Sequence, residues 1–318
     1  MTQSCTLTLS LSSIITLSSL YAIFALPTIL GNGVFLWVIF KSRSLRTISN
    51  LLVSSLALAD FFVGLVIDPV WIARCIISPR APNQPLDIAI GCLWIQTSIT
   101  TTFSLSVVSL DRYIAVRSAL QYNQIMTYER CRVAVIFVWI ASLTSAFSRL
   151  WVRSPTMLPI LWACVTGITI LLPMMLIIFC YYRIFVLARR QSRKIATQTL
   201  GFRAQFAAEG VRNRKTAKTV GYVVALFIIS WLPSLIASFV ELITRDNCTK
   251  PNMELVWLWV ELIAFTSSGI NPWLYSMRSN AFRNEMKRVF RMNRLRSSRI
   301  MVAKGKTRSE ELGIDSQG

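Results

Sequence analysis

Seven long apolar stretches constrain this chain more than any other feature of its sequence. They run over roughly 14–40, 48–73, 88–116, 133–150, 158–187, 219–243 and 255–277. Each approaches or exceeds the ~20 residues that a helix needs to cross the hydrocarbon core of a bilayer. Backbone polar groups must be satisfied inside the membrane, so such stretches are expected to be helices. The sequence therefore predicts an all-α membrane protein built as a seven-transmembrane helix bundle.

The composition supports this class, because 54% of the 318 residues are hydrophobic, 15% are charged and none is histidine. In a soluble protein the net charge of +20 would favour a nucleic-acid partner. Here 28 of the 34 basic residues lie in the tail, at the inner ends of the spans and in the connections after spans one, three and five. The positive-inside rule places those segments in the cytoplasm. We therefore expect a multi-pass plasma-membrane protein with an extracellular N-terminus, a cytoplasmic C-terminus and no nucleic-acid partner.

The expected organisation has four parts. These are a short extracellular N-terminus (1–13), a transmembrane domain (14–277), an amphipathic eighth helix (278–292) and a disordered cytoplasmic tail (293–318). The N-terminus has no basic n-region, so the first span is expected to act as the targeting signal. Asn247 begins an Asn-Cys-Thr glycosylation sequon between spans six and seven, on the side predicted to be extracellular.

The eighth helix is predicted from the segment AFRNEMKRVF at 281–290. Helical periodicity puts Phe282, Met286, Val289 and Phe290 on one face and basic residues on another. Such a helix is expected to lie along the inner leaflet of the bilayer.

Polar side chains occur at similar depth in three spans. Asp60 lies in span two, Asn32 in span one and Asn271 in span seven. A carboxylate inside a bilayer is costly and is expected to face the bundle interior. Two interpretations stay open: a structural hydrogen-bond cluster, or a site where Asp60 also holds a cation with help from Thr101 and Ser267. The second predicts an allosteric sodium ion at Asp60; no other metal and no cofactor is expected.

Prolines interrupt three spans, at Pro173, Pro233 and Pro272. Each removes a backbone donor and is expected to bend its helix. Trp231 and Phe227 lie just before the bend in span six, so their rings are expected to move with it.

Together these features resemble the rhodopsin-like (class A) G protein-coupled receptors, from Gly31 to Phe290. The motifs are GN at 31–32, LALAD at 56–60, DRY at 111–113, a lone Trp139, Pro173 with Tyr181, FIISWLP at 227–233, NPWLY at 271–275 and the 281–290 segment. Within the family the chain is loosely similar to adenosine, melanocortin and amine receptors.

The resemblance implies a receptor that passes an extracellular signal to a heterotrimeric G protein when the sixth helix moves outward. Arg112 is then expected to pair with Asp111 at rest and to meet the G protein after release. A lipid-anchoring arginine would explain the base but not the preceding acid. Other implied partners are arrestin, receptor kinases and a small extracellular ligand. The positions implied in coupling and activation are Asp111, Arg112, Tyr113, Leu120, Tyr181, Phe227, Trp231, Pro233, Asn271, Pro272 and Tyr275.

Three positions depart from the family pattern. Asn213 stands where many members carry an acid that holds the DRY arginine, so high ligand-independent signalling is expected. Trp94 stands where amine receptors carry an aspartate, which argues against an ordinary monoamine receptor. Phe265 stands where opsins carry the retinal-binding lysine, which excludes an opsin.

The usual extracellular disulfide is also doubtful. The second outer loop, WVRSPTM at roughly 151–157, contains no cysteine. Cys75, Cys248 or Cys5 remain alternative partners for Cys92, and the sequence does not choose among them.

The ligand site is expected at the outer ends of the spans. Asp68, Glu241 and Glu261 are acids there, and together they would favour a cationic ligand through carboxylate pairing and cation–π contacts. The alternative is that Asp68 and Glu241 are solvated rim residues and that Glu261 pairs with Arg74 or Arg149. A purine, a basic peptide and an unusual amine remain open as ligands. Aromatic residues expected around the site are Trp71, Trp94, Trp231, Trp257 and Phe265.

An enzyme is not expected, because the chain has no histidine, no paired cytoplasmic carboxylates and no phosphate-binding loop. A transporter or channel is the main alternative, since acids and broken helices inside a membrane also mark ion paths. Transporters often contain repeated halves, and no such repeat is found here.

Overall fold

A computed structural model describes residues 10–77, 85–152, 154, 157–196, 204–243, 250–278 and 280–291. All regular secondary structure in these residues is helical. Asn247 lies outside the described residues, as do the side chains of Asn213 and Tyr275.

The first half of the bundle comprises α1 (Leu11–Lys41), η1 (Arg43–Leu45), α2 (Ile48–Phe62), η2 (Val63–Ile67), α3 (Asp68–Ile76), α4 (Pro85–Arg117), η3 (Ala119–Gln121), α5 (Tyr122–Ile125), α6 (Tyr128–Ala146) and α7 (Ser148–Trp151). The second half comprises α8 (Leu158–Thr166), η4 (Gly167–Leu171), α9 (Leu172–Ala196), α10 (Ala204–Ile243) and α11 (Lys250–Arg278).

Within the part of the chain that the structure describes, seven helical stretches are long and apolar enough to cross a membrane, which agrees with the predicted number. They are Leu11–Lys41, Ile48–Ile76, Pro85–Arg117, Tyr128–Trp151, Ile160–Leu187, Val224–Ile243 and Met253–Trp273. The fourth begins five residues before the expected start at 133, because Thr127 caps the helix by accepting a hydrogen bond from the Arg130 backbone N–H.

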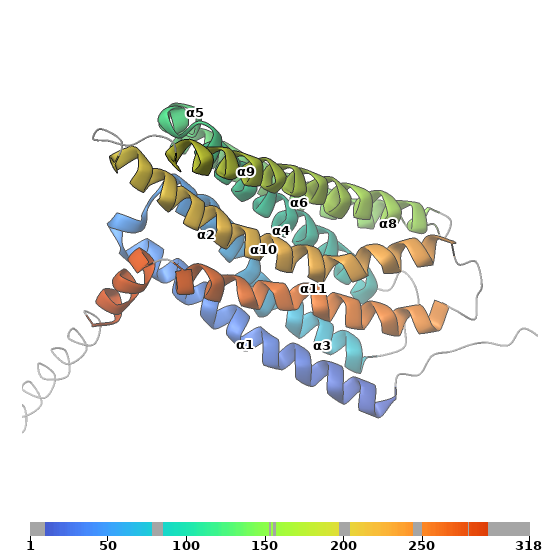
Figure 1. Cartoon of the computed structure of the whole chain (residues 1–318). Helices are drawn as coiled ribbons and strands as arrows, with labels where there is room; N and C mark the ends of the chain where they lie inside the picture. The colour runs from blue at the N-terminus through green and yellow to red at the C-terminus, as the bar shows by residue number, and fades with distance from the viewer. Residues whose placement is uncertain are drawn as a thin grey trace, which may run out of the picture.

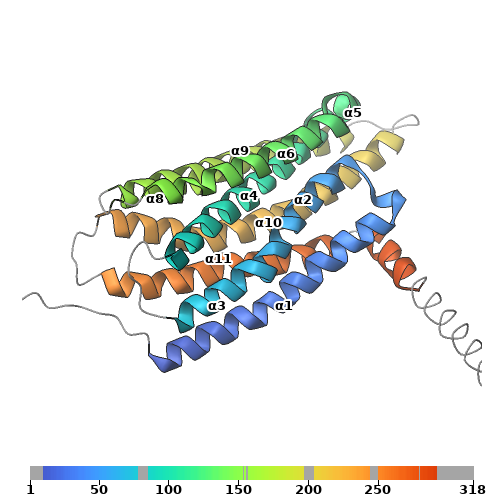
Figure 2. The same ribbon diagram turned by 180° about the vertical axis from the view of Figure 1, so that it is seen from behind.

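The helices form an elongated bundle in which α4 is the central member (Figure 1). It packs against α2, α6, α9 and α10, whereas α1 lies on the outside against α2, α3 and α11 (Figure 2). We call the end that holds α5 the predicted cytoplasmic end, and the end that holds Ile77 and Trp151 the predicted outer end. Large apolar side chains such as Phe40, Phe137 and Phe239 are about two-thirds exposed, as expected of a surface that faces lipid.

Small hydroxyl side chains fill the contacts of α4 with its neighbours. Thr102, Ser106 and Ser109 are buried, and each donates a hydrogen bond of 2.7–2.9 Å to the carbonyl four residues earlier in the same helix. These three hydroxyls are tolerated in the middle of a membrane helix because each is satisfied locally and because small side chains allow close packing.

Two π-helical segments precede prolines. The segment η2 ends two residues before Pro69, and η4 ends two residues before Pro173. Proline lacks an N–H and its ring clashes with the carbonyl four residues earlier, so a widened turn relieves the clash. Pro233 and Pro272 lie inside α10 and α11, as expected, and Pro27 inside α1 is a further proline that the sequence interpretation left out.

Residues 280–291 form a further helix that packs against the predicted cytoplasmic end of α1. Phe282 is buried and stacks on Phe35 with ring centroids 5.1 Å apart. Ser42 donates a 2.6 Å hydrogen bond to Glu285, which lowers the pKa of that partly buried carboxyl. The helix is therefore attached to the bundle by both its apolar face and a carboxylate.

Gly64 is required where η2 meets α1. A Cβ at this position would lie 2.9 Å from the Ala25 carbonyl oxygen and 2.9 Å from the Ile29 side chain. We predict that Gly64→Ala destabilises the protein by about 1–3 kcal/mol, because the backbone of α1 would have to shift. The matched control is Gly167→Ala in the other π segment, where a Cβ meets no atom within 4 Å. Thermal unfolding of both variants in detergent checks this; equal midpoints would contradict the packing described here.

Candidate functional site

Asp111 and Arg112 form the expected ion pair at the predicted cytoplasmic end of α4. The Arg112 Nε donates to Asp111 Oδ2 at 2.8 Å, and the Arg112 Nη2 also contacts this oxygen and the Ser49 hydroxyl. Asp111 is 1% exposed and Arg112 is 9% exposed. A guanidinium at the edge of the membrane is thus neutralised and covered.

Two residues that the sequence interpretation missed complete this network. Ser49 in α2 donates to Asp111 Oδ2 at 3.0 Å, and Tyr122 in α5 donates to Asp111 Oδ1 at 2.6 Å. Burial, followed by the hydrogen bond to Asp111, raises the pKa of Tyr122 to about 12. Tyr122 therefore stays a neutral donor at physiological pH. No motif in the sequence marks either residue, because the contact depends on how α2 and α5 meet α4.

Tyr113 and Leu120 lie on either side of this network. Tyr113 is buried against Cys180 and Ile184 of α9, and its hydroxyl accepts a 3.2 Å hydrogen bond from Arg117. Leu120 in η3 is 81% exposed. A large apolar side chain at the predicted cytoplasmic end is available to a partner protein.

Three of the expected polar residues of the bundle core, Asp60, Asn32 and Asn271, are joined through α11. Asn271 donates to Asp60 Oδ2 at 2.8 Å, and Asn32 donates to the Ser268 carbonyl at 3.1 Å. Within the described residues, Asp60 Oδ1, Asn32 Oδ1 and Thr101 Oγ1 are buried oxygens without a hydrogen-bond partner. Ser267, four residues before Asn271 in α11, is also buried. Its hydroxyl, however, donates to the Ala264 carbonyl at 2.7 Å. The core combines an acid with uncompensated acceptors, which is a donor set suited to a cation.

The aromatic pair in α10 is buried just before Pro233. The Phe227 and Trp231 ring centroids are 5.7 Å apart, and both rings are almost fully buried. Tyr181 in α9 is half-buried beside the core. The turn of α10 before Pro233 thus carries a bulky pair of rings inside the bundle.

Glu261 in α11 pairs with Arg74, one of the two alternatives left open by the sequence. Arg74 Nη1 and Trp71 Nε1 donate to the same oxygen, Glu261 Oε2, at 2.5 and 2.6 Å. Phe265 packs edge-on against Trp71, with centroids 5.2 Å apart. Asp68 is 2% exposed, so the alternative that it is a solvated rim residue is wrong.

The third outer acid, Glu241, is exposed and accepts a 2.8 Å hydrogen bond from Trp257. Trp94 is buried between Trp257 and Trp162, with centroids 6.5 and 5.4 Å away. The outer acids are thus divided: Asp68 and Glu261 are buried, whereas Glu241 is on the rim.

An ion pair links α4 to α7 near the expected position of the family disulfide. Cys92 forms no disulfide with any described cysteine. Next to it, Arg149 is 1% exposed, pairs with Asp87 at 2.6 Å and donates to the Val152 carbonyl at 3.0 Å. A Cβ on Gly91 would lie 2.9 Å from the Arg149 side chain. A buried guanidinium therefore holds the top of α4 to the start of the second outer loop without a covalent bond.

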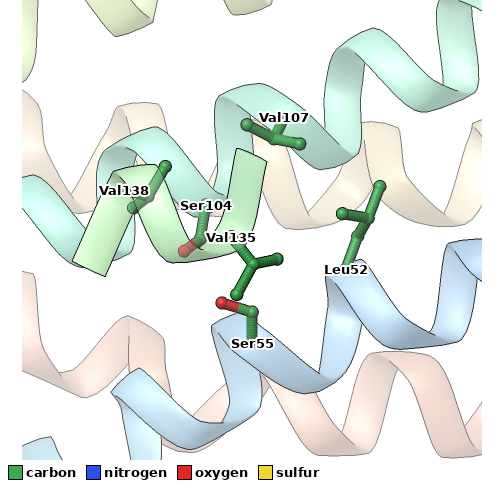
Figure 3. A pocket seen from close by; sticks show the side chains of 6 residues that line it. All are labelled: Leu52, Ser55, Ser104, Val107, Val135 and Val138. Atoms are coloured by element: carbon green, nitrogen blue, oxygen red, sulfur yellow. The ribbon is translucent and has the colours of Figure 1, made fainter. Parts of the chain in front are cut away.

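A small pocket of about 10 Å³ opens between α2, α4 and α6 (Figure 3). Ser55 and Ser104 point into it among valine and leucine side chains, and Ser55 accepts a 3.1 Å hydrogen bond from Trp139. This volume holds about one water molecule, so the pocket is too small for a ligand.

Comparison with known proteins places this arrangement in a family. The family model described as "7 transmembrane receptor (rhodopsin family)" matches residues 31–275. The chain belongs to the rhodopsin family of seven-transmembrane receptors. It is thus a multi-pass membrane receptor of the G protein-coupled class.

Similar curated receptors cover most of the chain. The receptor is 26% identical to the histamine H2 receptor of Cavia porcellus over 87% of its length and 79% of the relative's. It is 28% identical to the human adenosine receptor A2a, over 88% of its length and 73% of the relative's. For the trace amine-associated receptor 7e of Mus musculus the identity is 29%, over 84% and 81% of the two chains.

Tyr122→Phe is predicted to raise the receptor's basal signal. It removes a hydrogen bond to a buried carboxylate, which typically contributes about 1.5–3 kcal/mol, and so weakens the network that covers Arg112. A G protein reporter at matched surface expression is expected to rise about threefold or more. The control is Tyr128→Phe, because Tyr128 donates only to the Arg46 carbonyl. An unchanged signal for Tyr122→Phe would show that the network does not restrain the receptor.

Asp87→Asn is predicted to destabilise the receptor, because it leaves Arg149 buried with a weaker partner. We expect a loss of roughly 1–3 kcal/mol, seen as a lower thermal midpoint and lower surface expression. Arg149→Lys is expected to lose less, since it keeps the charge but not the second donor. Reducing agent is expected to leave the wild-type thermal midpoint unchanged. A large drop would indicate that a disulfide, and not the Arg149–Asp87 ion pair, holds α4 to the second outer loop.

Proposed function

We propose that the receptor activates heterotrimeric G proteins when the predicted cytoplasmic end of α10 moves outward and Arg112 is released from Asp111. The observation that supports this most directly is the burial of Arg112, which is paired with Asp111 and is only 9% exposed. Its guanidinium is always charged and offers several donors, so it can exchange one set of acceptors for another. The exposed Leu120 would add an apolar contact to the G protein.

The bend at Pro233 and the Phe227–Trp231 pair would couple this movement to the outer end. Rings packed at a bend cannot stay in place when the helix changes its angle, so a ligand that shifts Trp231 would bias α10. Tyr181 and Tyr275 would support the open state, and Asn271 with Pro272 would allow α11 to adjust.

High basal activity is part of the proposal. Asn213 has no charge, and its neighbours Arg212, Arg214 and Lys215 would repel Arg112 rather than hold it. The closed state would then be restrained mainly by the Asp111 network.

The uncompensated oxygens around Asp60 support a sodium ion as an allosteric ligand. Asp60, Asn32 and Thr101 would hold it, with Ser267 close to the site. When bound, the ion would supply a positive charge that stabilises the ionised carboxylate.

The proposed extracellular ligand is small and cationic. Buried acids and aromatic rings at the predicted outer end support it, and relatives named for histamine and trace amines are consistent with it.

The proposed orientation puts Asn247 outside for glycosylation and the basic tail inside, where arrestin and receptor kinases would meet it.

The test compares three forms of the receptor in a cell reporter at matched surface expression. Wild type is expected to signal without ligand, and Arg112→Ala to fall to the level of mock-transfected cells. Asn213→Glu supplies the missing acid and is expected to lower the basal signal by roughly two- to fivefold, the effect of an ion pair of up to about 1 kcal/mol. A wild-type signal equal to mock and unchanged in Asn213→Glu would contradict the proposal of high basal activity.

A further inference from the structure

A buried group of charged and aromatic side chains lies between α1, α3 and α11 at the predicted outer end. It contains Tyr21, Asp68, Trp71, Arg74 and Glu261, which we call the outer charge cluster. Trp71 and Arg74 of α3 both contact the Glu261 carboxylate, the Tyr21 hydroxyl contacts the Leu258 carbonyl one turn before Glu261, and Asp68 lies one turn before Trp71 in α3. Tyr21, Asp68, Trp71 and Glu261 are each at most 6% exposed, and the Arg74 side chain is 8% exposed.

The hydrogen bonds within the cluster are unevenly distributed. Glu261 Oε2 accepts from both Trp71 and Arg74, and the Tyr21 hydroxyl donates to the Leu258 carbonyl at 2.9 Å. All of the neutral donors are thus engaged. Asp68 is 2% exposed, and within the described residues no hydrogen bond or ion pair joins its carboxylate to another residue. The Arg74 Nε is buried there without an acceptor.

The formal charges are also unbalanced. Two carboxylates and one guanidinium leave an excess of one negative charge, and Arg74 already neutralises Glu261. An isolated buried carboxylate is strongly disfavoured unless a cation or a proton compensates it. The position of Arg74 also explains why Glu261 is a poor anchor: a cation would have to displace a 2.5 Å ion pair to reach it.

We propose that the outer charge cluster binds one small monovalent cation, with Asp68 as its anchor and Arg74 as the residue that excludes the cation from Glu261. This deepens the proposed cationic ligand and rests on that part of the proposed function. The Arg74 guanidinium lies over the Trp71 ring, 5.6 Å from its centroid, so an aromatic face in the cluster already attracts a cation. The cation is either an ammonium group of a ligand or a sodium ion from the extracellular fluid.

The test measures the thermal midpoint of the purified full-length receptor in lipid nanodiscs. Methylammonium and sodium are each compared with N-methyl-D-glucamine, which is too large for a site of this kind. Wild type is expected to gain roughly 2–4 °C with at least one small cation. A gain with methylammonium alone assigns an organic ammonium, and a gain with sodium assigns the metal ion; both support the site.

Asp68→Asn is expected to lose this gain, while the charge-matched control Glu254→Gln, an exposed acid of α11, keeps it. Sodium bound at Asp60 would contribute equally to wild type and Asp68→Asn, so their difference reports the outer site. The same gain in Asp68→Asn as in wild type, or a midpoint that changes with pH but with neither cation, would overturn the proposal.

Variants of the ion pair decide which acid is the anchor. Glu261→Gln frees Arg74 to pair with Asp68 and is expected to abolish the gain. The double variant Arg74→Gln/Glu261→Gln leaves Asp68 as the only charge and is expected to restore it. A gain that survives Asp68→Asn but is lost in the double variant would make Glu261 the anchor and overturn the assignment. The thermal midpoints need no G protein, so they test the cation site alone. A failure of the proposed G protein activation would be seen separately, in the cell reporter.

Discussion

The structure depends on one constraint: polar groups that enter the membrane must find partners inside the protein. Helices satisfy the backbone, and the polar side chains that remain are turned inward. Thr102, Ser106 and Ser109 of α4 donate to carbonyls of their own helix, Asp60 accepts from Asn271, and Arg112 is covered by Asp111 and Ser49. Every place where this satisfaction is incomplete, or can be exchanged, is a candidate for function.

Those places form a sequence along the bundle. At the predicted outer end, the Asp68 carboxylate and the Arg74 Nε have no hydrogen-bond partner among the described residues. In the core, the Asp60 Oδ1 also has none there. At the predicted cytoplasmic end the Asp111–Arg112 pair is engaged, and Ser49 on α2 and Tyr122 on α5 hold Asp111 in place. A ligand or ion that binds at the first two places and a G protein that binds at the third would act on the same set of bent helices.

The sequence predicted the number of spans and the main motifs, because apolar length and local spacing are properties of the chain itself. It placed Asp60 with Asn271 because the two lie at similar depth in their spans, and the family resemblance implied the pair of Asp111 with Arg112. It did not find Ser49 or Tyr122, since neither belongs to a motif and their contacts depend on how helices cross. It left the partner of Glu261 open between Arg74 and Arg149, and only the packing of α3 against α1 and α11 decided it. The π segments were missed because a proline indicates a bend but not the form of the bend.

The central claim is that the predicted cytoplasmic end of α10 moves away from the bundle and frees Arg112. Spin labels at Tyr222 in α10 and Val133 in α6, both exposed, allow this distance to be measured in nanodiscs. The account predicts that the distance lengthens when a G protein is added, and that Arg112→Ala weakens G protein binding. A distance that stays fixed while the same preparation catalyses nucleotide exchange would contradict it.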